Sequence, residues 1–436
     1  MSEDNLWCPL PWSHLSIKNN GTMRICSHSV DAEDTNVLID NHGEPLNIKT
    51  ASIDEVMNSN TLKKVRKKFL QNKWPSQCAR CKNEYELGKN SRNLWEAEKH
   101  LKHTFKLRQE DAEENTASDG TVDPQILTLD LRMGNECNLR CTMCFPGESK
   151  LWYKDFKEIT GEDTFDVDGE TYSLDLKEAD FDWSKKNNTV EKLLSVCQYL
   201  TKIKFGGGEP VIMKHNKSFI KKLIEMDLAK NIELEYSINI TKIPQDMWDL
   251  WTYFRQVVLC CSLDGIGLVA EACRWPTKWE DVKKNLSIID NSPSNIYAFT
   301  STTISSINYE HFIETMYWIK KQNFQKINKH NSHFASHAVR EPKPMSIAVF
   351  SPDDFRYIQE KLYDDALNLS NTRKEYDFYC EKINFYKGLY DIWRNEEYAD
   401  EFNRFQKQFF AFERLQSQNW KEIFPITYSI AVQDNA

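Results

Sequence analysis

The sequence lacks any long apolar run and any excess of basic charge. Its longest apolar stretches, such as residues 257–261, are far too short to cross a bilayer. Lys and Arg number 56 against 65 Asp and Glu, which gives a net charge of −9, whereas a nucleic-acid binder usually carries a basic footprint. Residues 1–5 lack the apolar core of a secretion signal. These absences favour a cytoplasmic protein that binds neither membrane nor nucleic acid.

What is present indicates packed domains and thiol chemistry. Apolar residues make up 40% of the 436 residues, which is enough for real cores and excludes a disordered chain. At ~150 residues per domain, the length predicts two or three domains. Twelve cysteines without a secretion signal point away from disulfides and towards metal or redox chemistry.

The two ends of the chain differ in pattern. Residues 1–92 hold four cysteines. A hairpin is predicted in this segment because apolar residues alternate on both sides of Gly21. Residues 93–108 predict a connecting helix. Residues 110–123 carry six acidic and no basic side chains, which is typical of a flexible linker. Residues after about 340 predict helices whose aromatic stripes we interpret as packing.

Between these ends, strand and helix patterns alternate. The strand candidates are residues 126–132, 203–205, 234–239, 257–263 and 298–304. The helix candidates are residues 219–226, 247–253, 279–289 and 309–321. Such alternation predicts a parallel sheet or barrel with crossover helices. In parallel barrels, functional residues lie at the carboxyl ends of the strands.

A first cysteine cluster follows the first of these strands. Cys137, Cys141 and Cys144 are spaced by three residues and then by two. Three thiolates can ligate three irons of a cubane cluster and leave the fourth iron open to a small molecule. A zinc site or a chance cluster is the alternative, but zinc motifs usually come as two CxxC-like pairs. The triplet therefore favours an open iron–sulfur cluster.

The next strand candidate ends in three glycines and a glutamate. Gly207 and Gly208 would let a ligand approach the backbone closely. Glu209 adds a carboxylate that could hold an ammonium group. A bare Gly-Gly-Glu is a weak motif, but its position at the end of the strand after the cysteine loop makes it specific.

Together the CxxxCxxC loop and the Gly-Gly-Glu-Pro strand end resemble the radical S-adenosylmethionine (SAM) superfamily over residues 126–330. The resemblance implies a partial (β/α)6 TIM-like barrel. It also implies that Cys137, Cys141 and Cys144 hold a [4Fe–4S] cluster whose open iron chelates the amino and carboxylate groups of SAM. The SAM amino group would be received by Gly207, Gly208 and Glu209.

Three further strand-end residues fit the same resemblance. Ser262 falls where a serine commonly meets the SAM ribose, and Arg274 where a guanidinium meets the SAM carboxylate. Asn239 stands in a Thr-Asn-Gly-like strand end, with Ile240 in place of the glycine. For Ser262 and Asn239, ordinary strand-end hydrogen bonding is the alternative. Met143 departs from the aromatic residue often found before the third cysteine.

A second cysteine set lies in the N-terminal segment. Four thiolates can close a zinc site or saturate an iron–sulfur cluster, and spacing alone does not choose between them. The set is Cys8, Cys26, Cys78 and Cys81. Its surroundings, with Glu84, Gly88, Ser91 and Arg92 after the CxxC, resemble the auxiliary-cluster module called SPASM in its shortened twitch form. No cysteine lies between 81 and 137, so one auxiliary [4Fe–4S] cluster is implied. The module usually follows the barrel, and here it precedes it.

The remaining cysteines and a histidine group carry no assigned chemistry. We interpret five cysteines as buried thiols, namely Cys197, Cys260, Cys261, Cys273 and Cys380. His330, His333 and His337 could line the barrel mouth or lie in a solvated loop, so no catalytic acid or base is predicted.

The resemblance implies an oxidoreductase or modifying enzyme. It would cleave SAM reductively to a 5′-deoxyadenosyl radical, which abstracts hydrogen from an unknown peptide or small molecule. The auxiliary cluster would relay an electron, and an external donor such as flavodoxin or ferredoxin would supply one. A non-catalytic zinc- or iron–sulfur-stapled binding or electron-transfer protein is the alternative.

The expected fold is α/β with four segments. Residues 1–92 would form a small cysteine-rich α+β twitch/SPASM-like domain, and residues 93–123 a connecting helix and acidic linker. Residues 124–335 would form the radical SAM core, and residues 336–436 a mostly helical C-terminal extension.

Overall fold

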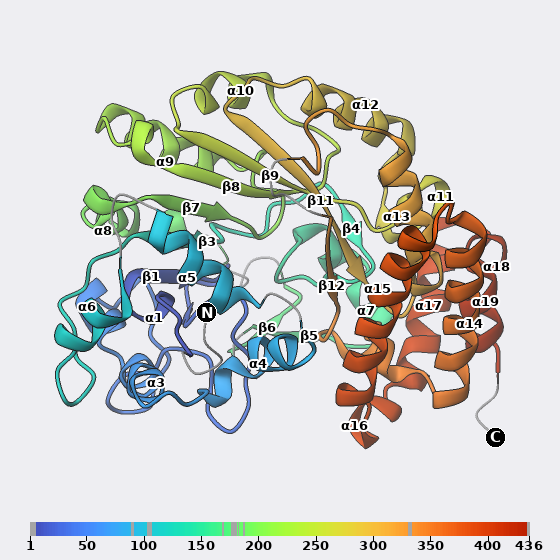
Figure 1. Ribbon diagram of the computed structural model, residues 1–436, viewed down its shortest axis with the longest axis horizontal. Coiled ribbons are helices and arrows are strands. Elements are labelled where there is room, and N and C mark those ends of the chain that lie inside the picture. The colour runs from blue at the N-terminus through green and yellow to red at the C-terminus, as the bar shows by residue number, and fades with distance from the viewer. Residues whose placement is uncertain are drawn as a thin grey trace.

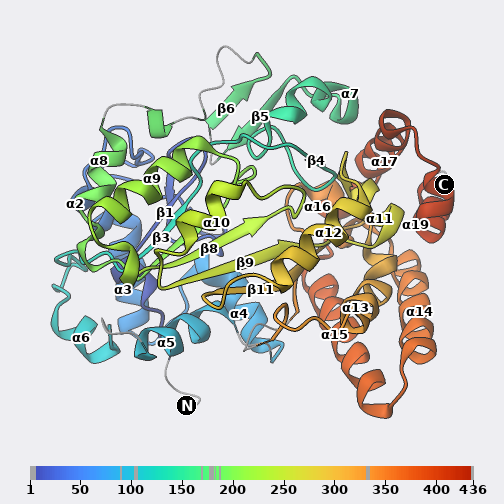
Figure 2. The same cartoon turned by 90° about the horizontal axis from the view of Figure 1, so that it is seen from above.

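The computed structural model describes residues 6–88, 91–102, 107–167, 170–175, 181, 183–185, 188–329 and 334–433. It is a mixed α/β structure built around one large sheet (Figure 1). Helices of the middle of the chain cover one side of this sheet, the N-terminal segment lies on its other side, and the C-terminal helices stand at one end (Figure 1 and Figure 2).

The large sheet has eight strands in the order β12-β11-β9-β8-β7-β3-β1-β2. From β3 to β12, strands that neighbour one another in the sheet follow the order of the chain and run parallel. The parallel sheet predicted from the alternating pattern is therefore confirmed. The bounds of the main strands are β3 Thr128–Leu131, β7 Lys202–Phe205, β8 Glu233–Ile238, β9 Gln256–Ser262, β11 Ile296–Ile304 and β12 Ala335–Ala338.

The two faces of the sheet differ in chemistry because successive side chains point to opposite sides. On one face Phe205 packs edge-on against Phe219, with ring centroids 6.5 Å apart, and Tyr236 packs at a tilt against Trp251, with ring centroids 5.4 Å apart. The helices over this face are α8 Thr189–Leu194, α9 Lys214–Glu225, α10 Gln245–Trp251, α12 Trp279–Asp290 and α13 Phe312–Lys321. The opposite face carries charged residues, among them Asp130, Lys204 and Glu235, which are opposite one another in register.

The N-terminal segment contributes its hairpin to this sheet. Strand β1 (His14–Ile17) pairs antiparallel with β2 (Met23–Arg24), which confirms the predicted hairpin. β1 also pairs parallel with β3, so the N-terminal segment shares the sheet of residues 124–335. The helices of this segment are α1 Leu10–Ser13, α2 Ile53–Met57, α3 Asn60–Leu70 and α4 Ala79–Glu86. Helix α5 (Arg92–Lys102) follows where the sequence predicts a connecting helix.

The acidic segment at 110–123 differs from the flexible linker that its composition predicts. It begins within helix α6 (Gln109–Glu114) and then packs on the N-terminal segment. The wholly buried Arg66 side chain donates hydrogen bonds to the carbonyls of Pro11, Met57 and Gly120, at 2.9, 2.6 and 3.0 Å. Because a buried guanidinium needs acceptors, this contact fixes the segment.

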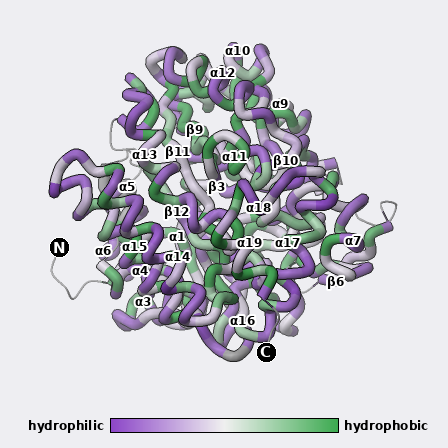
Figure 3. The backbone as a smooth tube through the Cα atoms, turned by 90° about the vertical axis from the view of Figure 1, so that its right-hand side faces the viewer, coloured by the Kyte–Doolittle hydropathy of each residue, from purple (hydrophilic) through white to green (hydrophobic). Residues whose placement is uncertain are grey.

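The C-terminal region is helical, as predicted. Its helices are α14 Pro352–Leu369, α15 Arg373–Trp393, α16 Glu396–Ala399, α17 Phe402–Gln416, α18 Trp420–Ile423 and α19 Pro425–Ala431. Hydrophilic and hydrophobic stretches alternate along them (Figure 3). Their aromatic residues are buried against one another, for example Phe409 and Trp420 with ring centroids 4.7 Å apart, which confirms the packing interpretation. Among the described helices, none is long and apolar enough to cross a membrane.

Candidate functional site

The three-cysteine loop follows β3 at its carboxyl end. Cys141 lies in the short strand β4 (Arg140–Cys141), which pairs with β10 (Arg274–Trp275) so that Cys141 is opposite Arg274. The amide of Cys144 donates to the carbonyl of Cys141 at 3.0 Å. A hydrogen bond between the two thiols lowers the pKa of Cys141 and raises that of Cys144. Burial, and then the Cys141 thiol, raise the pKa of Cys137 to about 12. The three thiols therefore gather in one place.

The glycine-rich end of β7 lies against this loop. The amide of Glu209 donates to the carbonyl of Glu136 at 2.8 Å, next to Cys137. Gly207 and Gly208 have φ angles of +72° and +54°, which L residues rarely adopt. A methyl group added to Gly208 would lie 2.3 Å from the Glu136 carbonyl oxygen. The structure thus brings together the two motifs that the sequence singled out.

Glu209 is buried beside Asn239. Only 1% of Glu209 is exposed, and its carboxylate accepts hydrogen bonds from the amides of Asn239 at 2.7 Å and Val211 at 3.5 Å. Burial nevertheless raises the pKa of Glu209 to about 8. A nearby cation stabilises the charged form of a buried carboxyl group. Glu209 is therefore suited to receive an ammonium group.

Asn239 and Ile240 form the strand end after β8. The Asn239 side chain donates to Asn138 Oδ1 at 2.8 Å and accepts from the amide of Thr241 at 3.0 Å. This is the strand-end hydrogen bonding that the sequence left as an alternative, and it links β8 to the cysteine loop. Ile240 has a φ of +64°, an unusual conformation for a β-branched residue, at the position where the resemblance has glycine.

Arg274 faces both the cysteine loop and a carboxylate that the sequence reasoning missed. Its Nη2 lies 2.6 Å from Asp264 Oδ2, and its Nη1 lies 3.9 Å from Cys141 Sγ. Asp264 also accepts a hydrogen bond from the amide of Thr303 at 2.7 Å. A carboxylate two residues beyond Ser262, at the end of β9, was the available sequence signal.

Ser262 is the predicted site residue that makes no hydrogen bond to the others in the described part of the chain. It is half-buried at the end of β9, in register with Ser301 of β11. In the part of the chain that the structure describes, no hydrogen bond joins the Ser262 side chain to Glu209, Asn239 or Arg274.

The Gly208→Ala substitution tests the contact between the two motifs. We expect it to lower stability by about 2 kcal/mol or more, because left-handed strain adds to a clash with a backbone carbonyl. Gly267→Ala is the matched control, since Gly267 has a φ of +55° and nothing within 4 Å of an added methyl group. It should cost only about 1 kcal/mol. Urea unfolding of both variants measures the difference, and equal losses would contradict the close contact.

The four N-terminal cysteines also lie together. Cys8, Cys26 and Cys81 are each 8% exposed, and Cys78 is half-buried. Burial first, and then the Cys26 thiol, raise the pKa of Cys8 and Cys78. The same two causes raise the pKa of Cys81 to about 12. Within the described residues, no group of three or more His, Cys, Asp or Glu side chains is arranged to hold a single metal ion.

The remaining cysteines are buried or half-buried, and the one described histidine of the histidine group lies in a strand. Cys197, Cys261 and Cys273 are buried, as predicted, while Cys260 and Cys380 are half-buried. His330 and His333 lie outside the described residues. His337 lies in strand β12 and not in a loop, with its Nδ1 3.5 Å from Arg80 Nη2 and its ring 6.3 Å from that of His28.

Several solved structures are similar to this chain at low identity. anSMEcpe with bound AdoMet is 16% identical over 56% of this chain and 61% of that chain, with a TM-score of 0.34. Streptococcus suis SuiB bound to precursor peptide SuiA is 13% identical over 82% of this chain and 86% of that chain, with a TM-score of 0.33. Likeness at this level does not carry an activity over to this chain.

One further solved structure and a family model are also similar to this chain. The radical S-adenosylmethionine methyltransferase TsrM from Kitasatospora setae is 11% identical over 52% of this chain and 39% of that chain, with a TM-score of 0.31. No curated protein matches the sequence. The family model of SPASM, an iron–sulfur cluster-binding domain, matches residues 8–82, a range that includes all four N-terminal cysteines. The N-terminal region thus carries an iron–sulfur cluster-binding module of the SPASM type, as the sequence predicted.

Proposed function

We propose that this protein is a radical SAM enzyme whose residues 124–335 form a partial (β/α)6 barrel. Cys137, Cys141 and Cys144 would hold the [4Fe–4S] cluster that binds SAM. The observation that carries the proposal is the contact between the cysteine loop and the Gly-Gly-Glu strand end, through the 2.8 Å hydrogen bond from Glu209 to Glu136. The strand order supports it, since neighbouring parallel strands in chain order suit a barrel wall.

The side chains around the cysteine loop fit the two charged ends of SAM. Glu209 would receive the ammonium group, while Gly207 and Gly208 leave the backbone open to the ligand. Arg274 Nε is a buried donor that has no acceptor among the described residues, so it can donate to the SAM carboxylate. Asn239 and Ser262 would complete the site from the ends of β8 and β9, with Ser262 towards the ribose.

The bound cluster would supply one electron that splits SAM into methionine and a 5′-deoxyadenosyl radical. The protein's part is to orient SAM, exclude water and present a C–H bond of a peptide or small-molecule substrate to that radical. The cluster of the SPASM module, held by Cys8, Cys26, Cys78 and Cys81, would relay an electron. The net reaction would be an oxidation or a modification in which SAM is the oxidant. A donor in the cytoplasm such as flavodoxin or ferredoxin would supply the electron that starts the cleavage.

The same proposal divides the chain as the sequence predicts. Residues 1–92 would be the auxiliary-cluster domain, residues 93–123 the connection, and residues 336–436 the helical extension. In this proposal the helical extension contributes no ligand to either cluster or to SAM.

Reductive cleavage of SAM tests this proposal directly. The full chain, reconstituted anaerobically with iron and sulfide, should form 5′-deoxyadenosine when SAM and dithionite are added, as quantified by mass spectrometry. Omitting dithionite should stop the product, because the cleavage needs an electron. Protein that binds zinc with little iron, and forms no product, would refute the proposal.

A further inference from the structure

A groove with a volume of about 550 Å³ opens on the surface of the N-terminal segment. Its lining comes from helix α3, from the chain between Trp74 and Lys82, and from residues 32–34. Helices α3 and α4, which both contribute to it, lie at the bottom of the molecule in Figure 1. Four lysines line the groove, namely Lys64, Lys67, Lys68 and Lys82.

The spacing of residues in α3 turns three of these lysines to the solvent. Leu62, Val65 and Phe69 are at most 2% exposed and pack into the core, whereas the lysines at positions 64, 67 and 68 are exposed. Residues three and four apart on a helix are neighbours, and like charges at that spacing are mildly destabilising. The sequence therefore places together three cations that do not help the helix to form.

The acidic residues around the groove leave these three lysines available. Glu33 and Asp34 also line the groove, and Lys82 pairs with Glu86 at 3.5 Å. Among the described residues, no ion pair joins a lysine at position 64, 67 or 68 to a carboxylate. Because the chain as a whole has a net charge of −9, this local group of cations stands out as a place for an anionic partner.

The groove adjoins the iron–sulfur module at Cys78. Gln77 and Ala79, the residues on either side of Cys78, both line the groove. The other three cysteines of the set are each 8% exposed, and Cys78 is the most exposed of the four. The set of cluster ligands therefore reaches furthest towards solvent beside the three exposed lysines.

Apolar side chains in the groove favour a protein as its occupant. Val65, Trp74 and Pro75 line it together with the lysines. Trp74 is half-buried, with its ring centroid 6.2 Å from that of Tyr85. Tryptophan is enriched among the residues that contribute most to binding between proteins. A small anion would use the charges alone, whereas a protein surface would use both the charges and the apolar contacts.

We propose that this groove is the docking site of an acidic one-electron carrier protein that reduces the auxiliary cluster. The inference rests on the proposed function, in which that cluster relays an electron, and it identifies where the electron enters. One electron moves from the reduced carrier to the oxidised cluster, and no bond forms or breaks. Encounters between electron-transfer proteins bury little surface, and opposite charges speed their formation. Both conditions are met by a basic groove beside the most exposed cluster ligand.

A [2Fe–2S] ferredoxin of negative net charge is the probe, added in its oxidised form to the full chain with its clusters. We expect binding that weakens as sodium chloride rises from about 0.01 to about 0.1 M, because the Debye length falls from about 30 to about 10 Å. Two proteins of negative net charge would show the opposite salt dependence without a basic docking site, since salt then screens a repulsion. Calorimetry measures the affinity at both salt concentrations.

The groove variant combines Lys64→Gln, Lys67→Gln and Lys68→Gln. We expect it to bind ferredoxin about tenfold more weakly at the lower salt concentration and to lose the salt-induced weakening. Its unfolding temperature should stay close to that of the wild type. Loss of favourable charges at the carboxyl end of α3 and relief of like-charge repulsion oppose one another.

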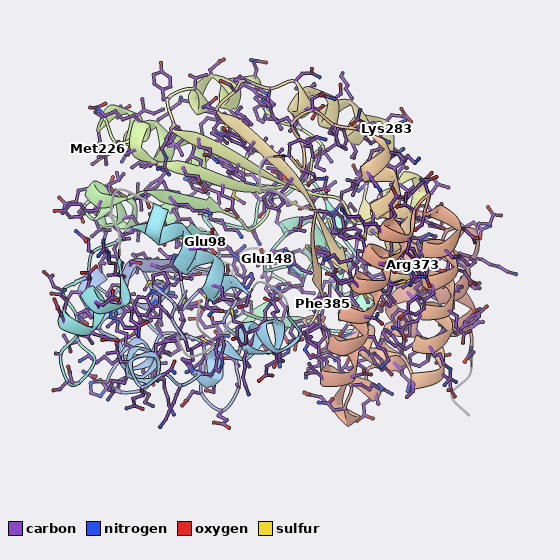
Figure 4. All side chains as sticks on the ribbon, viewed as in Figure 1. Glu98, Glu148, Met226, Lys283, Arg373 and Phe385 are labelled. Carbon is purple, nitrogen blue, oxygen red and sulfur yellow. The ribbon has the colours of Figure 1, made fainter. Side chains whose placement is uncertain are left out.

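The control variant combines Lys221→Gln, Lys283→Gln and Lys284→Gln, which changes the net charge by the same amount. These exposed lysines lie on α9 and α12, on the other side of the sheet from α3, and Lys283 is labelled in Figure 4. The control should bind ferredoxin as the wild type does. In stopped-flow measurements, reduced ferredoxin should reduce the clusters of the groove variant about tenfold more slowly than those of the control.

Equal ferredoxin affinity in the groove variant and the wild type, or no ferredoxin binding, would overturn the docking site. Self-association of the chain that the groove variant abolishes in sedimentation would also overturn it, because a second copy would then be the occupant. Tighter binding at higher salt would show that the contact lies outside the basic groove.

The two proposals fail separately. Formation of 5′-deoxyadenosine with dithionite, in protein whose ferredoxin binding does not depend on the three lysines, overturns the docking site alone. Ferredoxin binding that depends on these lysines, in protein that does not cleave SAM, overturns the radical SAM proposal alone.

Discussion

Replacing Cys141 by alanine is expected to abolish 5′-deoxyadenosine formation. Three thiolates are the whole protein ligand set of the proposed SAM cluster, so the loss of one leaves two. Cys141 is also the central member of the set, since it contacts the Cys144 thiol and lies 3.9 Å from Arg274 Nη1. Iron bound per chain should fall from about eight to about four, because the auxiliary cluster keeps its own four cysteines.

Cys197→Ala is the matched control for this prediction. Cys197 is 1% exposed, and its thiol donates to the carbonyl of Leu193 in the helical layer that covers the sheet. Its loss should cost about 1 kcal/mol of stability and leave iron content and product unchanged. Mass spectrometry of the product and iron analysis of the same samples measure both effects. A Cys141→Ala protein that keeps its iron and its product would contradict the assigned ligand set.

The parts of the fold that follow local patterns could be predicted. Alternation of apolar residues around Gly21 predicted the hairpin, and alternation of strands and helices predicted the parallel sheet. The meeting of Glu209 with the cysteine loop was also predictable, because parallel strands end at the same edge. Each of these predictions needs only periodicity within a short window or a general rule of chain topology.

What the sequence did not reveal depends on contacts between distant residues. The pairing of β1 with β3 joins residues 114 apart, as in the 2.8 Å contact of His14 with Thr128. The packing of residues 110–123 depends on Arg66, which in the sequence is one of five cations between positions 63 and 68, all in helix α3. Asp264 was visible in the sequence as a carboxylate after a strand. Its ion pair with Arg274 was not, because the position of Arg274 depends on the pairing of β10 with β4.

Asp264→Ala is expected to destabilise the protein by about 3–5 kcal/mol, because it leaves the buried Arg274 guanidinium without its carboxylate. The Asp264 side chain is 0% exposed and that of Arg274 is 13% exposed. Asp264→Asn is the milder variant, since the amide can still accept the hydrogen bond from Thr303. It should lose less stability than Asp264→Ala in urea unfolding.

A double-mutant cycle separates the pair from its surroundings. If the ion pair carries the effect, Asp264→Ala combined with Arg274→Ala should lose less stability than the sum of the two single variants, because neither charge is then buried alone. Asp264 would act as a positioning residue, since it holds Arg274 by Nη2 and leaves Nη1 beside Cys141 and Nε without an acceptor among the described residues. Asp264→Asn should accordingly weaken SAM binding by about tenfold with the iron content unchanged, as measured by calorimetry. Additive losses of stability with unaltered SAM affinity would assign the pair a packing role alone.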